Sequence, residues 1–387
     1  MSELSYLEKL LDGVEVEWLP LSDLARIRNG KDHKSLSEGE FPVYGSGGIM
    51  RYVDTYAYNK PSVLIPRKGS LGNLFFIDVP FWTVDTIFYT EIDEAQIRPK
   101  YLYYFLTTVG LGEMNQAGGV PSQTQSVLNK LKIPIPCPGN PQKSLAIQSE
   151  IVRILDKFTA VTAELTAELN MRKKQYNYYR DQLLSFDEEQ EKPIYLEKLL
   201  DGVEVEWLPL SGLARIRNGK DHKSLSEGEF PVYGSGGIMR YVDTYAYNKP
   251  SVLIPRKGSL GNLFFVNVPF WTVDTIFYTE IDEAQIRPKY LYYFLSTVGL
   301  GEMNQAGGVP SQTQSVLNKL KIPIPCPDNP EKSLAIQSEI VRILDKFDTL
   351  TNSITEGLPR EIELRQKQYE YYRDLLFSFP KPETISN

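Results

Sequence analysis

The chain contains nearly the same sequence twice. Residues 6–158 return at residues 195–347, an offset of 189 positions, with six mismatches in 153 aligned positions. A unit of this length can bury a core of its own, whereas solenoid units have only about 20 to 50 residues. We therefore predict two equal domains, and a ligand that offers two like sites, because whatever one domain binds the other also binds. The mismatches are Asp23/Gly212, Ile77/Val266, Asp78/Asn267, Thr107/Ser296, Gly139/Asp328 and Gln142/Glu331.

The composition is that of a soluble globular protein. Of 387 residues, 42% are hydrophobic and 24% charged, near the averages for such proteins. No apolar run approaches the roughly 20 residues that a membrane span needs. Acidic residues near the start stand where a secretory signal would be basic and then apolar, so we expect a cytoplasmic protein.

Cysteine is too rare to build a site. Cys137 and Cys326 are the same position of the repeat, each within the sequence IPIPCP. One cysteine per domain excludes a disulfide framework and a zinc site made of thiolates. We expect both to be small buried hydrophobic residues.

Two long helices are predicted to begin near the end of each repeat and to continue beyond it, where the two copies diverge. Asn140 and Asn329 are plausible N-caps, each followed by proline at the first helical position. Apolar residues then recur at spacings of three and four, which indicates a seam facing another helix. Each helix would exceed forty residues, about 60 Å, and would act as a spacer. The seam positions are Ile151, Ile154, Phe158, Val161, Leu165, Leu169, Tyr176, Tyr179 and Leu183, then Ile340, Ile343, Phe347, Leu350, Ile354, Leu358, Ile362, Tyr369, Tyr372 and Leu376.

The first spacer carries a tandem TAEL repeat at residues 162–165 and 166–169. Four-residue insertions locally unwind a coiled coil, and each adds roughly 6 Å of helix. The number of such units would therefore set the separation and rotation of the two domains. The alternative is that TAEL is only good helix-forming sequence. The second spacer has four more residues after Ile354, and Pro359 after Gly357 should kink it.

The repeats themselves are of mixed α+β type. Residues 61–92 are rich in β-branched and aromatic residues and are divided by Gly and Pro, which predicts several short strands. A short helix is expected at residues 99–109, and a further strand ends the polar segment at IPIP. A charged connector, residues 187–193, joins the two repeats. Many exposed turns make such a domain a scaffold for loops.

Signatures of catalysis are absent from the sequence. Residues 45–48 lack the last glycine of a dinucleotide fingerprint, and residues 66–72 do not match a phosphate-binding loop. Each repeat has one histidine, His33 or His222, so no histidine cluster can hold a metal. Asp85 and Glu91 could form a carboxylate pair, but acids on strands near Arg and Lys are more often structural partners.

Basic residues gather in the loops. Residues 26–34 hold four Lys or Arg against one acid, and residues 51–73 hold four against one with interleaved tyrosines. Lys and Arg suit phosphate contacts, while Arg, Asn and Gln suit readout of base edges. A polar loop with Asn115, Gln116 and Gln125 adds amide groups. The alternative is an ordinary solvated surface. Our candidate DNA-binding residues are Arg28, Lys31, His33, Lys34, Ser46, Arg51, Arg67, Lys68, Ser70 and Gln123, with Arg217, Lys220, His222, Lys223, Ser235, Arg240, Arg256, Lys257, Ser259 and Gln312 in the second repeat.

The net charge opposes strong binding to a polyanion. The chain has 49 acids against 42 Lys and Arg, a formal charge of −7, whereas nucleic-acid binding domains are usually basic. Acids concentrate at residues 187–206, while residues 208–325 have 12 Lys or Arg against 9 Asp or Glu. We therefore hypothesise that the chain alone binds DNA weakly and gains positive charge from a partner subunit.

These segments together resemble a known family. They are the WLPL openings at Trp18 and Trp207, SGGIMRYVDTY, IPRKGSLGNLFF, PFWTVDT, NQAGGVPSQTQSVLNKLKIPIP, and the doubled TAEL followed by RKKQYNYYRDQLLSF. The chain resembles the specificity subunit of a type I restriction-modification enzyme, of the IC-like class, over essentially its whole length. The TAEL segment is the most specific of these motifs.

The resemblance implies an α+β fold of two target recognition domains, related by a pseudo-twofold and joined by two long helices in an antiparallel coiled coil. It implies residues 1–143 as the first domain, 144–187 as the first spacer helix, 188–332 as linker and second domain, 333–379 as the second spacer helix, and 380–387 as a tail. Each domain would read half of a bipartite double-stranded DNA site, and the TAEL count would set the spacing.

The resemblance also implies partners. Two methyltransferase subunits would dock on the helices and restriction subunits would join them. S-adenosylmethionine, ATP and Mg would act on those subunits, and this chain would be non-catalytic, without a cofactor of its own. Family members usually carry two different domains. Near-identical domains should instead read the same half-site on opposite strands, an interrupted palindrome.

A rival interpretation is a scaffold protein whose coiled coil dimerises and whose paired domains bind peptide or glycan. Its tyrosine-rich strands and acidic composition would fit that role as well. A self-contained hydrolase is a weaker third possibility, because no paired base and nucleophile can be identified. Copurification of a methyltransferase subunit distinguishes the first interpretation from the second.

Overall fold

The computed structural model describes residues 13–114, 120–186, 199, 202–303 and 308–380. The chain divides into two compact units. Unit 1 contains residues 1–165 and 362–387, and unit 2 contains residues 166–361. Each unit therefore combines one copy of the repeat with the end of a long helix that follows the other copy. The predicted connector at 187–193, together with Asn115 and Gln116, lies outside the described residues.

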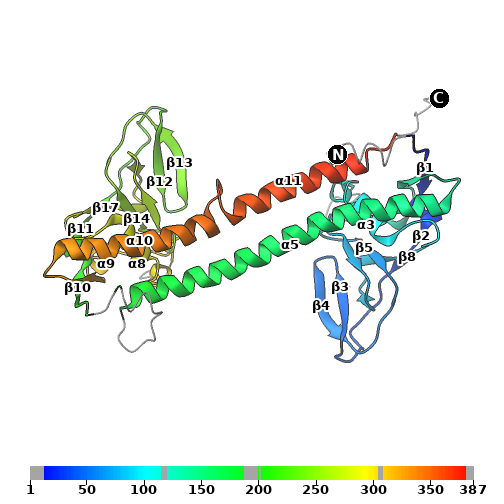
Figure 1. Cartoon of the computed structure of the whole chain (residues 1–387), viewed down its shortest axis with the longest axis horizontal. Coiled ribbons are helices and arrows are strands. Elements are labelled where there is room, and N and C mark those ends of the chain that lie inside the picture. The colour runs from blue at the N-terminus through cyan, green and yellow to red at the C-terminus, as the bar shows by residue number, and fades with distance from the viewer. Residues whose placement is uncertain (1–12, 115–119, 187–198, 200–201, 304–307, 381–387) are drawn as a thin grey trace. The chain divides into compact units, whose positions relative to one another are not determined.

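Unit 1 is built on three small sheets (Figure 1). The largest is antiparallel with the order β2-β8-β5-β6, the second has the order β4-β3-β7, and the third pairs β1 with β9. Within the second sheet, β3 pairs with β7 in parallel. The elements are β1 (Val16–Pro20), α2 (Leu21–Leu24), β2 (Ala25–Asn29), β3 (Phe41–Gly45), β4 (Gly48–Val53), β5 (Ser62–Pro66), β6 (Phe75–Ile77), β7 (Trp82–Thr83), β8 (Ile87–Ile92), α3 (Pro99–Leu106), η1 (Leu111–Glu113), α4 (Gln125–Asn129), β9 (Lys132–Pro136) and α5 (Pro141–Ser185).

Unit 2 repeats these elements in the same order. Its sheets have the orders β11-β17-β14-β15, β13-β12-β16 and β10-β18. The elements are β10 (Val205–Pro209), α7 (Leu210–Leu213), β11 (Ala214–Asn218), β12 (Phe230–Gly234), β13 (Gly237–Val242), β14 (Ser251–Pro255), β15 (Phe264–Val266), β16 (Trp271–Thr272), β17 (Ile276–Ile281), α8 (Pro288–Leu295), η2 (Leu300–Glu302), α9 (Gln314–Leu317), β18 (Lys321–Pro325) and α10 (Pro330–Asn352). Helix α11 (Leu358–Leu376) follows, and its residues from 362 on belong to unit 1, just as residues 166–185 of α5 belong to unit 2. The predicted α+β class with two repeated domains and long helices is confirmed.

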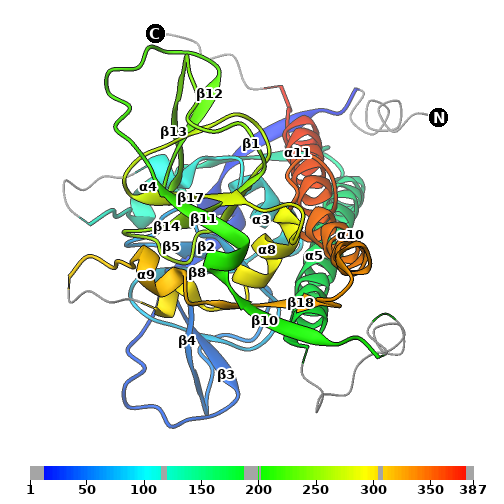
Figure 2. The same ribbon diagram turned by 90° about the vertical axis from the view of Figure 1, so that its left-hand side faces the viewer.

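The core of unit 1 lies between the four-stranded sheet and the long helix. Helix α3 fills this space, as Figure 2 shows. Tyr101 of α3 is fully buried, and its hydroxyl donates to the carbonyl of Pro134 over 2.8 Å. Gln148 of α5 is also fully buried. It accepts from the Arg98 amide and donates to the Gln96 carbonyl, which fixes α5 against the start of α3.

The end of the chain completes the core of unit 1. Leu376 is fully buried, while Phe377 and Phe379 are 7% and 6% exposed. The ring of Phe377 lies 5.2 Å from that of Tyr101, centroid to centroid. The indole of Trp18 donates to the carbonyl of Pro380 over 2.8 Å. In unit 2 the end of α5 has the corresponding role, with Leu183 and Leu184 buried in the core.

The predicted helix starts are confirmed. Asn140 accepts from the amide of Lys143 over 3.0 Å, and Asn329 accepts from that of Lys332 over the same distance. These contacts satisfy amides that the first turn of a helix leaves unpaired. Helix α5 then runs for 45 residues without interruption, in place of the 144–187 expected from the sequence.

The single second spacer helix predicted at 333–379 is wrong. Helix α10 ends at Asn352 and α11 begins at Leu358, so the chain breaks instead of kinking. The Ser353 hydroxyl accepts from the amides of Thr355 and Glu356. Gly357 has φ +81°, and a Cβ there would lie 2.4 Å from the carbonyl oxygen of Thr349. The inserted residues therefore fold back as a turn that only glycine can close.

The seam prediction is confirmed at its ends and wrong at two positions nearer the middle, Val161 and Ile354. Ile151, Leu183, Ile340 and Leu376 are fully buried. Val161 is 41% exposed, and Ile354, which lies in the turn after α10, is 79% exposed. The four-plus-four spacing carries Val161 off the buried face, because 3.6 residues per turn does not match that step.

The predicted burial of the two cysteines is also wrong. Cys137 and Cys326 are half-buried free thiols with φ of 49° and 46°. Each lies in the turn between the last strand of the repeat and the long helix. The Cys137 amide donates to Glu15 and its carbonyl accepts from Asn140. The chain reverses here, and this places the side chain at the rim of the core. No helix among the described residues is long and apolar enough to cross a membrane.

Candidate nucleic-acid interface

The turn between β7 and β8, residues 83–86, holds the basic loops of unit 1 together. Its Thr83 carbonyl accepts from the Lys31 amide over 2.8 Å. Its Thr86 carbonyl accepts from the amides of Arg67 and Lys68 over 2.8 and 3.2 Å. Two loops that are more than thirty residues apart in the sequence therefore meet at one turn. We call residues 83–86, and 272–275 in unit 2, the hub turn.

Only glycine fits at position 30, because the loop after β2 passes so close to the hub turn. A Cβ at Gly30 would lie 2.0 Å from the carbonyl oxygen of Val84, far inside any real contact. The Asn-Gly step after β2 thus lets the loop with Lys31 and Lys34 pass directly against the hub turn. The Trp82 indole donates to the carbonyl of Lys31 over 3.1 Å and fixes the same loop from the other side.

Two further segments join the hub turn. The Ser46 amide donates to the Thr86 hydroxyl over 3.3 Å, and the Asn73 side chain donates to the Ser46 carbonyl over 3.3 Å. The Gly69 amide donates to the carbonyl of Pro121. The β3–β4 turn, the β5–β6 loop and the segment before α4 therefore form one continuous surface. In Figure 1 the β3–β4 hairpin projects on the side of the sheet away from α5.

Several candidate residues are available on this surface. Lys31, Lys34, Lys68 and Ser70 are exposed, while His33, Ser46 and Arg67 are half-buried. The Arg67 guanidinium lies over the Phe88 ring at 5.8 Å, which holds it against the sheet. The Lys68 ammonium is 3.9 Å from Asp85, and both are largely exposed, so the pair leaves Lys68 accessible to an anion. Asp85 is a charge partner, as the sequence suggested.

Other candidates are occupied within the domain. Arg28 forms an ion pair with Glu91 at 3.0 Å, and this partner raises the pKa of the Arg28 guanidinium. Arg51 donates to the Leu36 carbonyl and thereby ties β4 to the loop after β2. Gln123 is 2% exposed, and its amide donates to the Pro66 carbonyl. The prediction that Gln123 contacts DNA is therefore wrong, because its amide is buried and cannot reach a ligand on the surface.

Unit 2 places the equivalent residues in the same way. The Lys220 amide donates to Thr272 over 2.7 Å, and the Arg256 and Lys257 amides donate to Thr275 over 2.8 and 3.2 Å. Lys220, Lys223, Lys257 and Ser259 are exposed, and His222, Ser235 and Arg256 are half-buried. Arg217 pairs with Glu280, Arg240 donates to Leu225, and Gln312 is 1% exposed. The two interfaces thus present the same donors.

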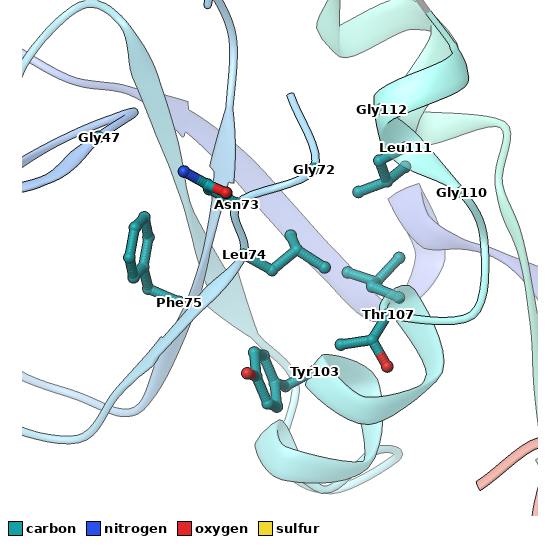
Figure 3. Close-up of a pocket in the computed structure, with 11 residues that line it drawn as sticks. Gly47, Gly72, Asn73, Leu74, Phe75, Tyr103, Thr107, Gly110, Leu111 and Gly112 are labelled. Atoms are coloured by element: carbon teal, nitrogen blue, oxygen red, sulfur yellow. The ribbon is translucent and has the colours of Figure 1, made fainter. Parts of the chain in front are cut away.

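A glycine-lined hollow lies between the β5–β6 loop and α3 in unit 1, and the sequence did not predict it. Its volume is about 570 Å³. Figure 3 shows Asn73 and Phe75 on one wall, with Tyr103 of α3 and Thr107 just after this helix opposite. Gly47, Gly72 and Gly112 also line it, so main-chain atoms are open to a ligand. The glycines in GSLGN and VGLGE were the only signal in the sequence.

The described residues contain no cluster of three or more His, Cys, Asp or Glu side chains that could bind a metal ion. The Nδ1 atom of His33 is buried and has no hydrogen-bond partner within the part of the chain that the structure describes. Exposed lysines, main-chain amides and hydroxyls therefore make up the chemistry of the surface. Such groups suit the phosphates and edges of a nucleic acid.

Comparison with known proteins decides the family. Residues 13–172 and 203–364 each match the type I restriction modification DNA specificity domain. The chain belongs to the family of type I restriction-modification specificity subunits. It is 42% identical to the EcoR124I/EcoR124II specificity subunit of Escherichia coli, with all of both chains covered. It is 35% identical to a putative specificity subunit of Haemophilus influenzae, over 97% of this chain and 98% of that one.

Solved structures from type I restriction-modification systems share the fold. The subunit from M. genitalium matches with a TM-score of 0.64 at 19% identity, covering 96% of this chain and 98% of that one. A chain from a study of type I complex assembly matches with a TM-score of 0.54 at 13% identity, over 94% and 97%. The predicted resemblance is confirmed. The family consists of specificity subunits, so the expectation of a DNA-binding, non-catalytic chain is confirmed as well.

Proposed function

We propose that this specificity subunit reads a bipartite DNA site whose two halves are the same sequence on opposite strands. Each hub turn, with its lysines, would face one half-site. The observation that supports this most directly is the agreement of the two interfaces, in which the hub-turn hydrogen bonds of units 1 and 2 agree within 0.1 Å. Domains with the same donors in the same places select the same base edges.

A twofold relation between the domains would complete the palindrome. We propose that the two spacers pair antiparallel and hold the domains in opposite orientation, with the TAEL repeats setting the distance between half-sites. Half-site centres would then lie about one helical turn of DNA apart, roughly 34–36 Å, or slightly more. Four mismatches within the repeats change charge, and all lie outside the hub turns and the loops that carry Lys31, Lys34 and Lys68. They are Asp23/Gly212, Asp78/Asn267, Gly139/Asp328 and Gln142/Glu331.

The partners in this proposal are two methyltransferase subunits, joined by restriction subunits. S-adenosylmethionine, ATP and Mg would be bound by those partners and not by this chain. The spacer helices support the proposal because they expose aromatic side chains that are available to contact a partner subunit. Tyr178 is 54% exposed and Tyr371 is 57% exposed, and exposed aromatic residues are enriched at protein interfaces.

Coexpression tests this function. The chain should copurify with a type I methyltransferase subunit, and the purified complex should transfer methyl groups from S-adenosylmethionine to adenine in one defined DNA motif. A complex lacking the chain should not select that motif. Failure of any methyltransferase subunit to copurify, combined with binding to peptide or glycan, would favour the scaffold interpretation instead.

A further inference from the structure

A β-bulge in the β3–β4 hairpin aims an apolar side chain at solvent beside the hub turn. Val43 pairs with Arg51, but the next residue, Tyr44, pairs with Ile49. Met50 is therefore the extra residue of the bulge. Val232, Tyr233, Ile238 and Arg240 repeat this register around Met239 in unit 2. Bulges often occur beside binding sites, where they redirect one side chain.

The bulge leaves two consecutive apolar residues exposed. Ile49 is 50% and Met50 59% exposed, and their counterparts Ile238 and Met239 are 49% and 59% exposed. An exposed apolar residue is common on any protein. These four lie beside the hub turn, on a surface that also presents lysines, hydroxyls and main-chain amides.

The side chain of Met50 packs against a glycine of the neighbouring strand. A Cβ at Gly45 would lie 2.8 Å from the sulfur of Met50 and 3.4 Å from the hydroxyl of Thr86. The thioether thus packs on the bare main chain of Gly45, next to the residue whose carbonyl holds Arg67 and Lys68. Gly234 makes the same contact with Met239, with a Cβ-to-sulfur separation of 2.7 Å. Any larger residue at these glycines would displace the methionine.

The neighbours of this side chain indicate what it contacts. The lysines around a hub turn suit phosphates, but an uncharged thioether does not attract an anion. In the major groove of DNA the one apolar group that distinguishes a base pair is the C5-methyl of thymine, which apolar side chains contact. Methionine is flexible and polarisable, so it adapts to such a group.

We propose that Met50 and Met239 each contact the methyl group of a thymine in their half-site and make recognition depend on it. This inference rests on the proposed reading of a bipartite DNA site. It names the residue that reads one base pair and the chemical group that is read. A docking surface for another protein is the competing role of the same patch, and the test separates the two.

The test uses deoxyuridine, which is thymidine without the methyl group. Once methylome sequencing has defined the motif, each thymine is replaced singly by deoxyuridine in a duplex, and binding of the complex with its methyltransferase subunits is measured. At one thymine in each half-site, affinity should fall about fourfold, the factor that one buried methyl or methylene group contributes.

Variants assign that preference to the methionines. Because the two half-sites are identical, the complex can bind in either orientation, so the variants are compared on a duplex with deoxyuridine in both half-sites. The parent should lose affinity about sixteenfold, the product of two fourfold effects, and Met50→Gln and Met239→Gln should each lose only about fourfold. The protein with both changes should show no loss. Met50→Leu, which keeps an apolar side chain of similar volume, should retain the preference. Because Met50 is mostly exposed, these proteins should fold, and a thermal melt of each one verifies it.

Three results would overturn the inference. The first is equal affinity for thymine and deoxyuridine at every position of a defined motif. The second is a thymine preference that survives in the protein with both Met50→Gln and Met239→Gln. The third is a Met50→Gln protein that keeps its DNA preference but loses the methyltransferase subunit, which would make the patch a protein contact. If no motif is methylated at all, the proposed function fails together with this inference.

Discussion

Removing the ring of Phe377 should destabilise unit 1 and leave unit 2 intact. The ring is 7% exposed and contacts Tyr101 and Phe105 at centroid distances of 5.2 and 5.6 Å. Replacing a buried phenylalanine by alanine costs about 3 to 5 kcal/mol, because it loses burial and leaves a cavity. A cost of 3 kcal/mol raises the population of the opened state roughly a hundredfold. Phe377→Ala should therefore open the first domain although it lies near the other end of the sequence.

Hydrogen exchange with mass spectrometry can measure this in spite of the repeat. Peptides from the two domains would usually have the same mass, but the mismatches act as natural labels. Peptides that contain Ile77 and Asp78 report on β6, and those that contain Val266 and Asn267 report on β15. Where exchange reports opening of the whole domain, Phe377→Ala should speed exchange about a hundredfold in peptides that contain Ile77 and Asp78. Exchange in peptides that contain Val266 and Asn267 should not change.

Matched variants complete the comparison. Leu184 of α5 aligns with Phe377 and is 2% exposed, so Leu184→Ala should show the opposite pattern, at a cost of about 2 to 5 kcal/mol. Ser378→Ala, at an exposed neighbour, should change neither domain. Equal loss of protection at both pairs of labels, or no loss at the first pair, would refute the account of how each core is completed.

Three further outcomes are expected. Lys68→Ala should reduce the slope of log binding constant against log salt by about one, and the double change with Lys257→Ala by about two; an unchanged slope in a salt titration would remove these lysines from the interface. Gly357→Ala should lower the melting temperature, because its φ of +81° and the 2.4 Å approach to a carbonyl exclude a Cβ; an unaltered calorimetric melt would contradict this. Burial raises the pKa of the Tyr101 phenol well above its usual value, so the unfolded chain loses this proton at lower pH than the folded one. The free energy of unfolding should therefore fall as pH rises past about 10. Thermal melts from pH 8 to 11 should show a smaller fall in Tyr101→Phe than in the parent. An equal fall in both proteins would disprove the assignment to Tyr101.

Local sequence signals predicted much of the fold. The N-caps at Asn140 and Asn329, the strands within residues 61–92 and the helix beginning at Pro99 all follow from short-range chemistry that does not depend on distant parts of the chain. The two-domain organisation followed from the repeat itself. The turn after Asn352 was expected only as a kink, because proline and glycine mark an irregularity without specifying how many residues it contains.

Contacts between distant segments could not be predicted. Nothing local indicates that Phe377 fills a core formed by residues 16–155, or that Met50 is the extra residue of a bulge, since both depend on pairing across the chain. The candidate interface residues were likewise predicted correctly in part. Lys31, Lys34 and Lys68 are exposed as the loop composition suggested, whereas Arg28 pairs with Glu91 and Gln123 is buried. A charge pattern identifies basic loops but not which side chains the domain itself uses.

Methylome sequencing of cells that carry this subunit with its methyltransferase tests the central claim most directly. Two recognition surfaces with the same donors in the same geometry should yield one motif whose halves are identical on opposite strands, separated by a fixed number of unspecified base pairs. Two unrelated half-sites would contradict the account, because equal surfaces would then be reading different bases.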